Sequence, residues 1–212
     1  MKYLLLDAAG TILHKPDLFI KINEVLNRNG LTVPLDKLRY NHKLLSEAIH
    51  FPDRTDASFY GYFNSELLAS LGIVPTKKIT DDIFQYCSYL PWEKFDDTSI
   101  LNEIKVPVGI ISNFNLSLKS KIEEQFGSVF SDFFVSEEMG ISKPSIEFYE
   151  KALHKIGINA EDILYVGDSL KLDLVPSLQL GFNSYLIDRD NFYLNNSHKI
   201  SSLSELKKII QS

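Results

Sequence analysis

The periodicity of the second half of the sequence restricts the fold more than any other feature. From residue 92 onward, apolar runs alternate with stretches of helical spacing; the runs are "VPVGIISNFN", "DFFVS", "DILYVGDS" and "SYLID". Strands that alternate with helices predict a parallel sheet with crossover helices on both faces. A fifth apolar run, Tyr3 to Asp7, predicts a buried strand near the start of the chain.

Residues 16 to 90 follow only the helical period. Leu18, Ile22, Val25 and Leu26 share one face of a first predicted helix, and three further helices follow, up to Cys87. The sequence therefore predicts an α/β fold: a doubly wound parallel (Rossmann-like) sheet with an inserted all-helical cap domain. We expect the core to comprise residues 1–14 and 92–212 and the cap residues 15–91.

Composition restricts the partners and the compartment. The chain has 212 residues, a net charge of −6 and a single cysteine. An acidic surface disfavours nucleic acid and anionic membranes as partners, and one cysteine cannot form an intrachain disulfide. We expect no secretory leader, because the apolar run before Asp7 is too short for one, and no membrane span, because no apolar stretch approaches ~18 residues. We expect a cytoplasmic monomer or homodimer with no nucleic-acid or membrane partner.

Polar side chains collect where the predicted strands end. Asp7 ends the first strand, Ser112 and Asn113 end the next, and Asp168 follows a later one. Asp173 lies five residues beyond Asp168, and Lys143 precedes a predicted helix. Ligands of open parallel sheets bind beyond the carboxyl ends of the strands. Carboxylates suit Mg²⁺, and lysine, hydroxyl and amide groups suit phosphate, so the set predicts a site for both.

Four motifs in this order resemble the haloacid dehalogenase-like superfamily, in its version with a helical cap after the first strand. "LLLDAAGTIL" is similar to the first motif, D-x-D-G-T, with Ala9 in place of the second Asp. "GIISNFN" resembles the second motif, "ISKPSIEFY" the third and "VGDSLKLD" the fourth. The resemblance covers nearly the whole chain and implies a hydrolase.

The resemblance also implies a role for each matching residue. It implies an Mg²⁺-dependent phosphatase that acts on a small phosphorylated molecule through an aspartyl-phosphate on the nucleophile. The catalytic residues would be Asp7, Ser112 and Lys143. Substrate would be bound by Ser112, Asn113, Lys143 and the backbone around Gly10 and Thr11. The metal ligands would be Asp7, the carbonyl of Ala9, Asp168 and Asp173, the last directly or through water.

Ala9 leaves the chemistry open, because the missing acid normally protonates the leaving group and activates water. Such proton transfer contributes ~10²- to 10⁴-fold. Three alternatives follow. The substrate has a good leaving group and needs no protonation, another group supplies the proton, or the protein only binds or regulates. A fourth alternative is a phosphonatase-like reaction that uses a cap lysine, and the candidates are Lys21, Lys37, Lys43, Lys77 and Lys78. Dehalogenases carry Tyr at this position and need no metal. This chain has Ala at the position and keeps Asp168, a predicted metal ligand, so dehalogenation is disfavoured.

Overall fold

The chain folds into two compact units. The computed structural model describes residues 1–194 and 197–211. One unit combines Met1–His14 with Lys94–Ser212, and the other is Lys15–Glu93; we call them the core unit and the helical unit. Residues 195, 196 and 212, which fall within the core range predicted from the sequence, lie outside the described residues.

The core unit contains a six-stranded sheet in which every neighbouring pair is parallel. Its strands lie in the order β5-β4-β1-β6-β7-β8, so the first strand of the chain is central and the order reverses on either side of it. This confirms the predicted doubly wound parallel α/β fold. The strands are β1 (Tyr3–Leu6), β4 (Val108–Ser112), β5 (Asp132–Val135), β6 (Ile163–Gly167), β7 (Asn183–Ile187) and β8 (Lys199–Ile200).

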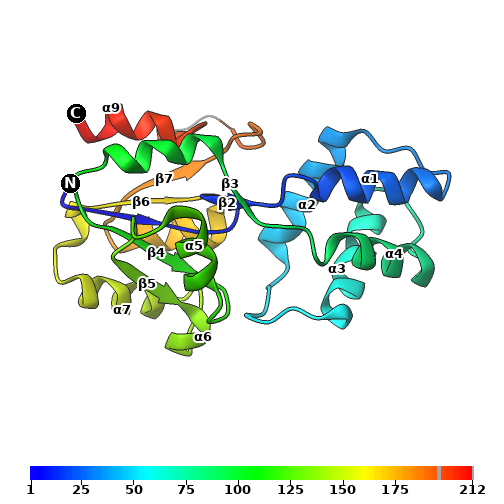
Figure 1. Ribbon diagram of the computed structural model, residues 1–212, viewed down its shortest axis with the longest axis horizontal. Coiled ribbons are helices and arrows are strands. Elements are labelled where there is room, and N and C mark those ends of the chain that lie inside the picture. The colour runs from blue at the N-terminus through cyan, green and yellow to red at the C-terminus, as the bar shows by residue number, and fades with distance from the viewer. Residues whose placement is uncertain (195–196, 212) are drawn as a thin grey trace. The chain divides into compact units, whose positions relative to one another are not determined.

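Both faces of the sheet are covered. Leu5, Ile111 and Tyr165 point to one face and pack with Phe148 and Tyr149 of α7 (Ile146–Ile156). The residues that alternate with them, such as Leu4 and Leu6 on β1, are equally buried on the other face. Figure 1 shows α7 and α9 (Leu206–Gln211) on opposite sides of the strands. Burial on both faces explains why the central strands are continuous apolar runs.

Shorter elements complete the core unit. It contains the 3₁₀ segments η1 (Asp96–Glu103), η2 (Ala160–Asp162) and η4 (Leu203–Glu205), the π-helical turn η3 (Leu170–Leu174), and the helices α5 (Leu118–Phe126), α6 (Ser136–Met139) and α8 (Val175–Gln179). The single helix expected over residues 171–181 is therefore a π-helical turn followed by a short α-helix.

The helical unit contains four helices, α1 (Leu18–Arg28), α2 (Leu35–Ala48), α3 (Ala57–Ser70) and α4 (Lys77–Cys87) (Figure 1). Their apolar faces form one core around Leu26, Leu38, Leu67 and Ile83. The sequence pattern predicted all four helices.

The sequence pattern did not predict β2 (Leu13–His14) and β3 (Glu93–Lys94), which pair as a two-stranded sheet. Strands of two residues are too short to show a period.

Candidate active site

Three neighbouring strands bring polar side chains to one edge of the core sheet. Asp7 follows β1, Ser112 ends β4 and Asp168 follows β6. Because β1 lies between β4 and β6 and all three run parallel, their carboxyl ends meet at the same edge. This is the switch point of the sheet, where ligands of such folds bind.

Asp7 is fixed by its backbone and by both carboxylate oxygens. Its amide donates to the carbonyl of Val166 on β6 at 2.9 Å. Lys143 Nζ donates to Oδ1 at 2.6 Å, and the Thr11 hydroxyl donates to Oδ2 at 3.2 Å. The residue is 5% exposed, so the carboxylate has a defined orientation in a mostly dry environment.

Lys143 is the cation at the centre of the cluster. Its ammonium lies 2.6 Å from Asp7 and 2.6 Å from Asp173, and all three side chains are buried. Asn113, the residue after β4, fixes the backbone of Lys143: its Oδ1 accepts from the Lys143 amide at 2.7 Å, and its Nδ2 donates to the Lys143 carbonyl at 2.9 Å. The side chain predicted to bind substrate thus uses both ends of its amide to hold the lysine segment.

Asp173 is engaged by groups that sequence analysis did not single out. Besides Lys143, the Tyr165 hydroxyl donates to Oδ1 at 2.6 Å and the Ser169 amide donates to Oδ2 at 3.0 Å. Burial raises the pKa of Tyr165 well above its usual value, so the phenol stays protonated and donates. Asp173, held by these donors, therefore orients Lys143. The only sequence feature that could have indicated a role for Tyr165 is its place in a strand, two residues before the Gly-Asp motif.

Two glycines leave room for the carboxylates. A Cβ on Gly10 would lie 2.3 Å from an oxygen of Asp168, and a Cβ on Gly167 would lie 2.3 Å from Cγ of Asp173. Gly10 also has a φ of +92°, which other residues rarely adopt. The glycines of the first and fourth motifs therefore permit direct packing of acidic groups against the backbone.

The cluster contains three carboxylates and one ammonium, and this imbalance affects the pKa values of Asp7 and Lys143. Burial raises the pKa of Asp7 to about 7; Lys143 opposes this change, whereas Asp173 and Asp168 add to it. Burial alone would lower the pKa of Lys143, but the Asp173 and Asp7 carboxylates outweigh it and raise that pKa. The cluster thus holds a charged lysine and more carboxylates than this one charge can neutralise, and Asp7, Asp168 and Asp173 are close enough together that they could hold a metal ion.

The turn after Asp7 contains the predicted residues Ala9, Gly10 and Thr11. The Gly10 amide donates to the carbonyl of Leu13 at 2.8 Å, and the Thr11 amide donates to that of Ala8 at 3.3 Å. Both amides expected to hold phosphate are thus engaged within the turn, and the contact of Thr11 with the cluster is through its hydroxyl. Ala9 lies in this turn, partly buried, and Ser112 is buried at the end of β4.

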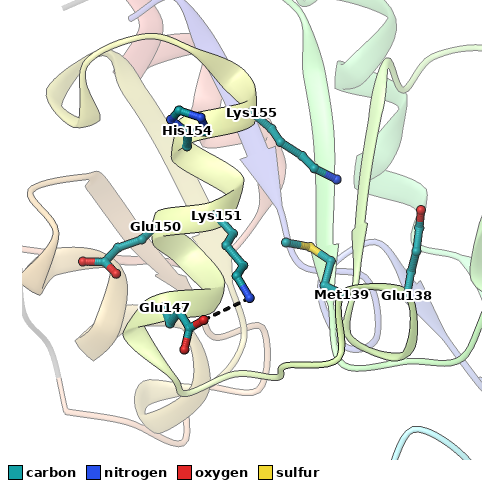
Figure 2. Close-up of a pocket in the computed structure, with 7 residues that line it drawn as sticks. All are labelled: Glu138, Met139, Glu147, Glu150, Lys151, His154 and Lys155. Atoms are coloured by element: carbon teal, nitrogen blue, oxygen red, sulfur yellow. Dashed lines mark ion pairs between the residues drawn. The ribbon is translucent and has the colours of Figure 1, made fainter.

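A surface pocket elsewhere in the core unit involves different residues. Figure 2 shows it between α6 and α7, lined by charged side chains and Met139, with Glu147 and Lys151 paired at 2.9 Å. The lining residues that belong to α7 are exposed, unlike Phe148 and Tyr149 of the same helix, and Met139 of α6 is partly buried. None of them belongs to the carboxylate cluster, so this pocket is separate from the candidate site.

Comparison with known proteins agrees with this geometry. Residues 1–177 match the family model described as haloacid dehalogenase-like hydrolase. The chain belongs to the haloacid dehalogenase-like hydrolase family. This confirms the family resemblance and the expectation that the protein is a hydrolase.

Two curated relatives and one solved structure illustrate the family. The glyceraldehyde 3-phosphate phosphatase of Methanocaldococcus jannaschii is 30% identical over 73% of this chain and 74% of its own. The haloacid dehalogenase-like hydrolase domain-containing protein 3 of Danio rerio is 27% identical over 63% of this chain and 60% of its own. The magnesium-bound HAD-hydrolase YfnB from Bacillus subtilis superposes with a TM-score of 0.70 at 20% identity, covering 100% and 99% of the two chains.

Among residues 1–194 and 197–211, none of the helices combines the length and the apolar character that a bilayer crossing requires.

Proposed function

We propose that this hydrolase is an Mg²⁺-dependent phosphatase that cleaves a small phosphorylated molecule through an aspartyl-phosphate on Asp7. The observation that carries the proposal is the buried Asp7 carboxylate, which is held by Lys143 and Thr11. It lies in a cluster with Asp168 and Asp173. The name of the relative from Methanocaldococcus jannaschii, a glyceraldehyde 3-phosphate phosphatase, supports a small sugar phosphate as substrate.

The donor set fits a hard divalent cation. Asp7, Asp168 and Asp173 each offer one oxygen, and these oxygens lie within 4.8 Å of one another. Carboxylate oxygens are the ligands that Mg²⁺ prefers, and a cation would also keep Asp7, with its raised pKa, ionised. Asp7, Asp168 and the Ala9 carbonyl would hold the ion. Asp173, whose oxygens are engaged by Lys143, Tyr165 and Ser169, would reach it through water.

The proposed reaction has two displacements. In the first, the Asp7 carboxylate attacks phosphorus, a new P–O bond forms, and the bond to the leaving oxygen breaks. In the second, water attacks the aspartyl-phosphate, releases inorganic phosphate and regenerates Asp7. Like charges ~4 Å apart repel by about 4 kcal/mol at an intermediate dielectric, and the Lys143 ammonium offsets this repulsion. When bound, Mg²⁺ adds positive charge that polarises the phosphoryl group.

Ala9 determines which phosphates react fastest. Without an acid at this position, the leaving oxygen departs unprotonated, so leaving groups of low pKa are favoured. We therefore expect acetyl phosphate and p-nitrophenyl phosphate to react faster than alkyl esters such as glyceraldehyde 3-phosphate. Ala9→Asp restores an acid/base group, and we expect it to raise kcat for the alkyl ester by about 10²-fold or more.

The test compares wild type, Asp7→Asn and Ala9→Asp on these three substrates, with Mg²⁺ and with a chelator. Turnover that disappears in Asp7→Asn and with chelator supports the proposal, and acid quenching should trap a phosphoenzyme in wild type alone. Equal rates in wild type and Asp7→Asn would contradict it. Mg²⁺-dependent phosphate binding without turnover in either wild type or Ala9→Asp would instead favour a binding or regulatory protein.

A further inference from the structure

Arg189, which follows β7, lies against the turn that carries the candidate nucleophile. Its Nη1 donates to the carbonyl of Gly10 at 3.0 Å, and its Nη2 donates to the carbonyl of Thr11 at 2.8 Å. The contacts join residues 179 and 178 positions apart in the chain. The guanidinium thus fixes two successive peptide groups of the turn from outside the cluster of Asp7, Lys143 and Asp173.

Holding these carbonyls determines the geometry of the turn. A peptide group is planar, so an anchored carbonyl also fixes the direction of the amide on the same peptide. The Gly10 carbonyl shares a peptide with the Thr11 amide, and the Thr11 hydroxyl contacts Asp7. Gly10 has no side chain and a φ of +92°, so its conformation depends on contacts to its backbone. Arg189 supplies two contacts of this kind.

Arg189 is itself held firmly. Its Nε and Nη2 donate to Asp97 Oδ2 and Oδ1 at 3.1 and 2.8 Å, a bidentate pair. Its guanidinium lies 3.7 Å from the centre of the Phe95 ring. Asp97 Oδ2 also accepts from the Ser202 hydroxyl at 3.1 Å and from the Leu203 amide at 3.0 Å. A planar, stacked and bidentate group loses little freedom per bond, which makes it suited to hold a loop.

We propose that Arg189 is a positioning residue for the phosphoryl-transfer reaction, acting through the Gly10–Thr11 backbone and supported by Asp97 and Phe95. This inference rests on the proposed function, because it assigns Arg189 a part in that reaction. Arg189 does not need to contact the substrate. It holds the turn so that Asp7 and the Thr11 hydroxyl keep their orientation toward the reacting phosphorus.

The test compares Arg189→Met and Arg189→Lys with a matched control, Lys207→Met. Lys207 pairs with Glu103 at 2.9 Å and so also joins η1 to a C-terminal element, but it does not contact the turn. For acetyl phosphate, we expect kcat to fall by about 10- to 100-fold in Arg189→Met, since small misplacements have effects of this size. Arg189→Lys keeps the positive charge but not the bidentate geometry of the guanidinium, so its kcat should lie between those of Arg189→Met and wild type. KM and the control should change by less than about twofold.

Guanidinium ion distinguishes positioning from general stability. Arg189→Ala leaves a space beside Phe95 that free guanidinium can enter. Guanidinium weakens folded proteins in general, so a rise in kcat at low concentration indicates that the ion occupies this space and does not reflect a general effect on the protein. We expect such a rise in Arg189→Ala and none in wild type or in Lys207→Met. An equal response in all three, or kcat within about twofold of wild type in Arg189→Met, would overturn the proposal.

A measurement without turnover separates this inference from the proposed function. In NMR spectra of the metal-free protein, the Gly10 carbonyl and Thr11 amide resonances should shift in Arg189→Lys and stay in place in Lys207→Met. If wild type hydrolyses no phosphate, the proposed function fails, and shifted resonances would still support the hold on the turn. Unchanged resonances in Arg189→Lys would overturn the inference even if wild type is an active phosphatase.

Discussion

The two units of the chain use the same chemical pair, an ammonium and a carboxylate, in opposite surroundings. In the core unit, Lys143 lies 2.6 Å from both Asp7 and Asp173, and the three side chains are at most 7% exposed. On α4 of the helical unit, Lys78 lies 2.9 Å from Asp82, with the two side chains 71% and 32% exposed. The distances are similar, and the solvation is not.

This difference shows that the distance within an ion pair does not indicate its energy. Removing charges from water costs several kcal/mol per ion, which a buried pair regains only through close geometry and further hydrogen bonds. Water screens an exposed pair, which contributes about 0 to 1 kcal/mol. A buried cluster of three charges is therefore an expensive way to stabilise a fold, and such clusters are found where chemistry requires shifted pKa values.

The largest expected effect comes from removing the central cation. Lys143→Met leaves Asp7 and Asp173 buried without their counterion, and we expect the free energy of unfolding to fall by about 3–5 kcal/mol. Urea titration at neutral pH measures the change. Phosphatase turnover should also disappear, because the charge that offsets the phosphoryl group is lost. A loss of less than about 1 kcal/mol, the range of an exposed pair, would contradict the comparison between the two units.

The next effect concerns the half-buried acid of the cluster. A ligand at 100 times its Kd stabilises a protein by about 2.7 kcal/mol, and we expect Mg²⁺ to raise the stability of wild type by this route. Asp168→Asn removes a predicted metal ligand and should abolish the gain. Thermal unfolding with and without Mg²⁺ measures it, with Asp81→Asn on the exposed face of α4 as control. The same gain in Asp168→Asn as in wild type would remove this residue from the metal site.

The units should also respond to pH with opposite signs. In the helical unit, His42 packs edge-on against Phe19 and Phe63, and burial, with a smaller contribution from Lys43, lowers its pKa to about 4. The unfolded chain takes up this proton near pH 6.5, so stability is lost as pH falls from about 6.5 to 4. The pKa of Asp7 is raised to about 7, so its contribution is present at low pH and lost as pH rises through about 7.

His42→Phe isolates the first of these slopes. One pKa unit corresponds to about 1.4 kcal/mol, so wild type should lose about 2 kcal/mol more than the variant between pH 7 and 4, after allowance for the partial exposure of the ring. Urea titrations at a series of pH values provide the measurement. Identical pH profiles for wild type and variant would show that His42 titrates as it does in the unfolded chain.

Much of the fold and part of the candidate site follow from local sequence. The apolar runs of β1, β4 and β6 predict buried parallel strands, and parallel strands place Asp7, Ser112 and Asp168 at one edge whatever the loops do. The contacts that hold the cluster depend instead on loop paths. Asn113 meets Lys143 across 30 residues and Arg189 meets Gly10 across 179, and neither contact leaves a period or motif in the sequence.

The smallest expected effect comes from the exposed pair of Lys78 and Asp82 on α4. Lys78→Met removes the exposed ammonium that contacts Asp82 and also Asn29 at 2.9 Å. We expect the free energy of unfolding to change by less than about 0.5 kcal/mol, since i,i+4 pairs on helices contribute about 0.3–0.5 kcal/mol. Added salt should reduce even this difference, whereas the deficit of Lys143→Met should persist, because salt screens exposed charges much more than buried ones. If both variants lost the same stability and responded equally to salt, burial would not be what distinguishes the two pairs.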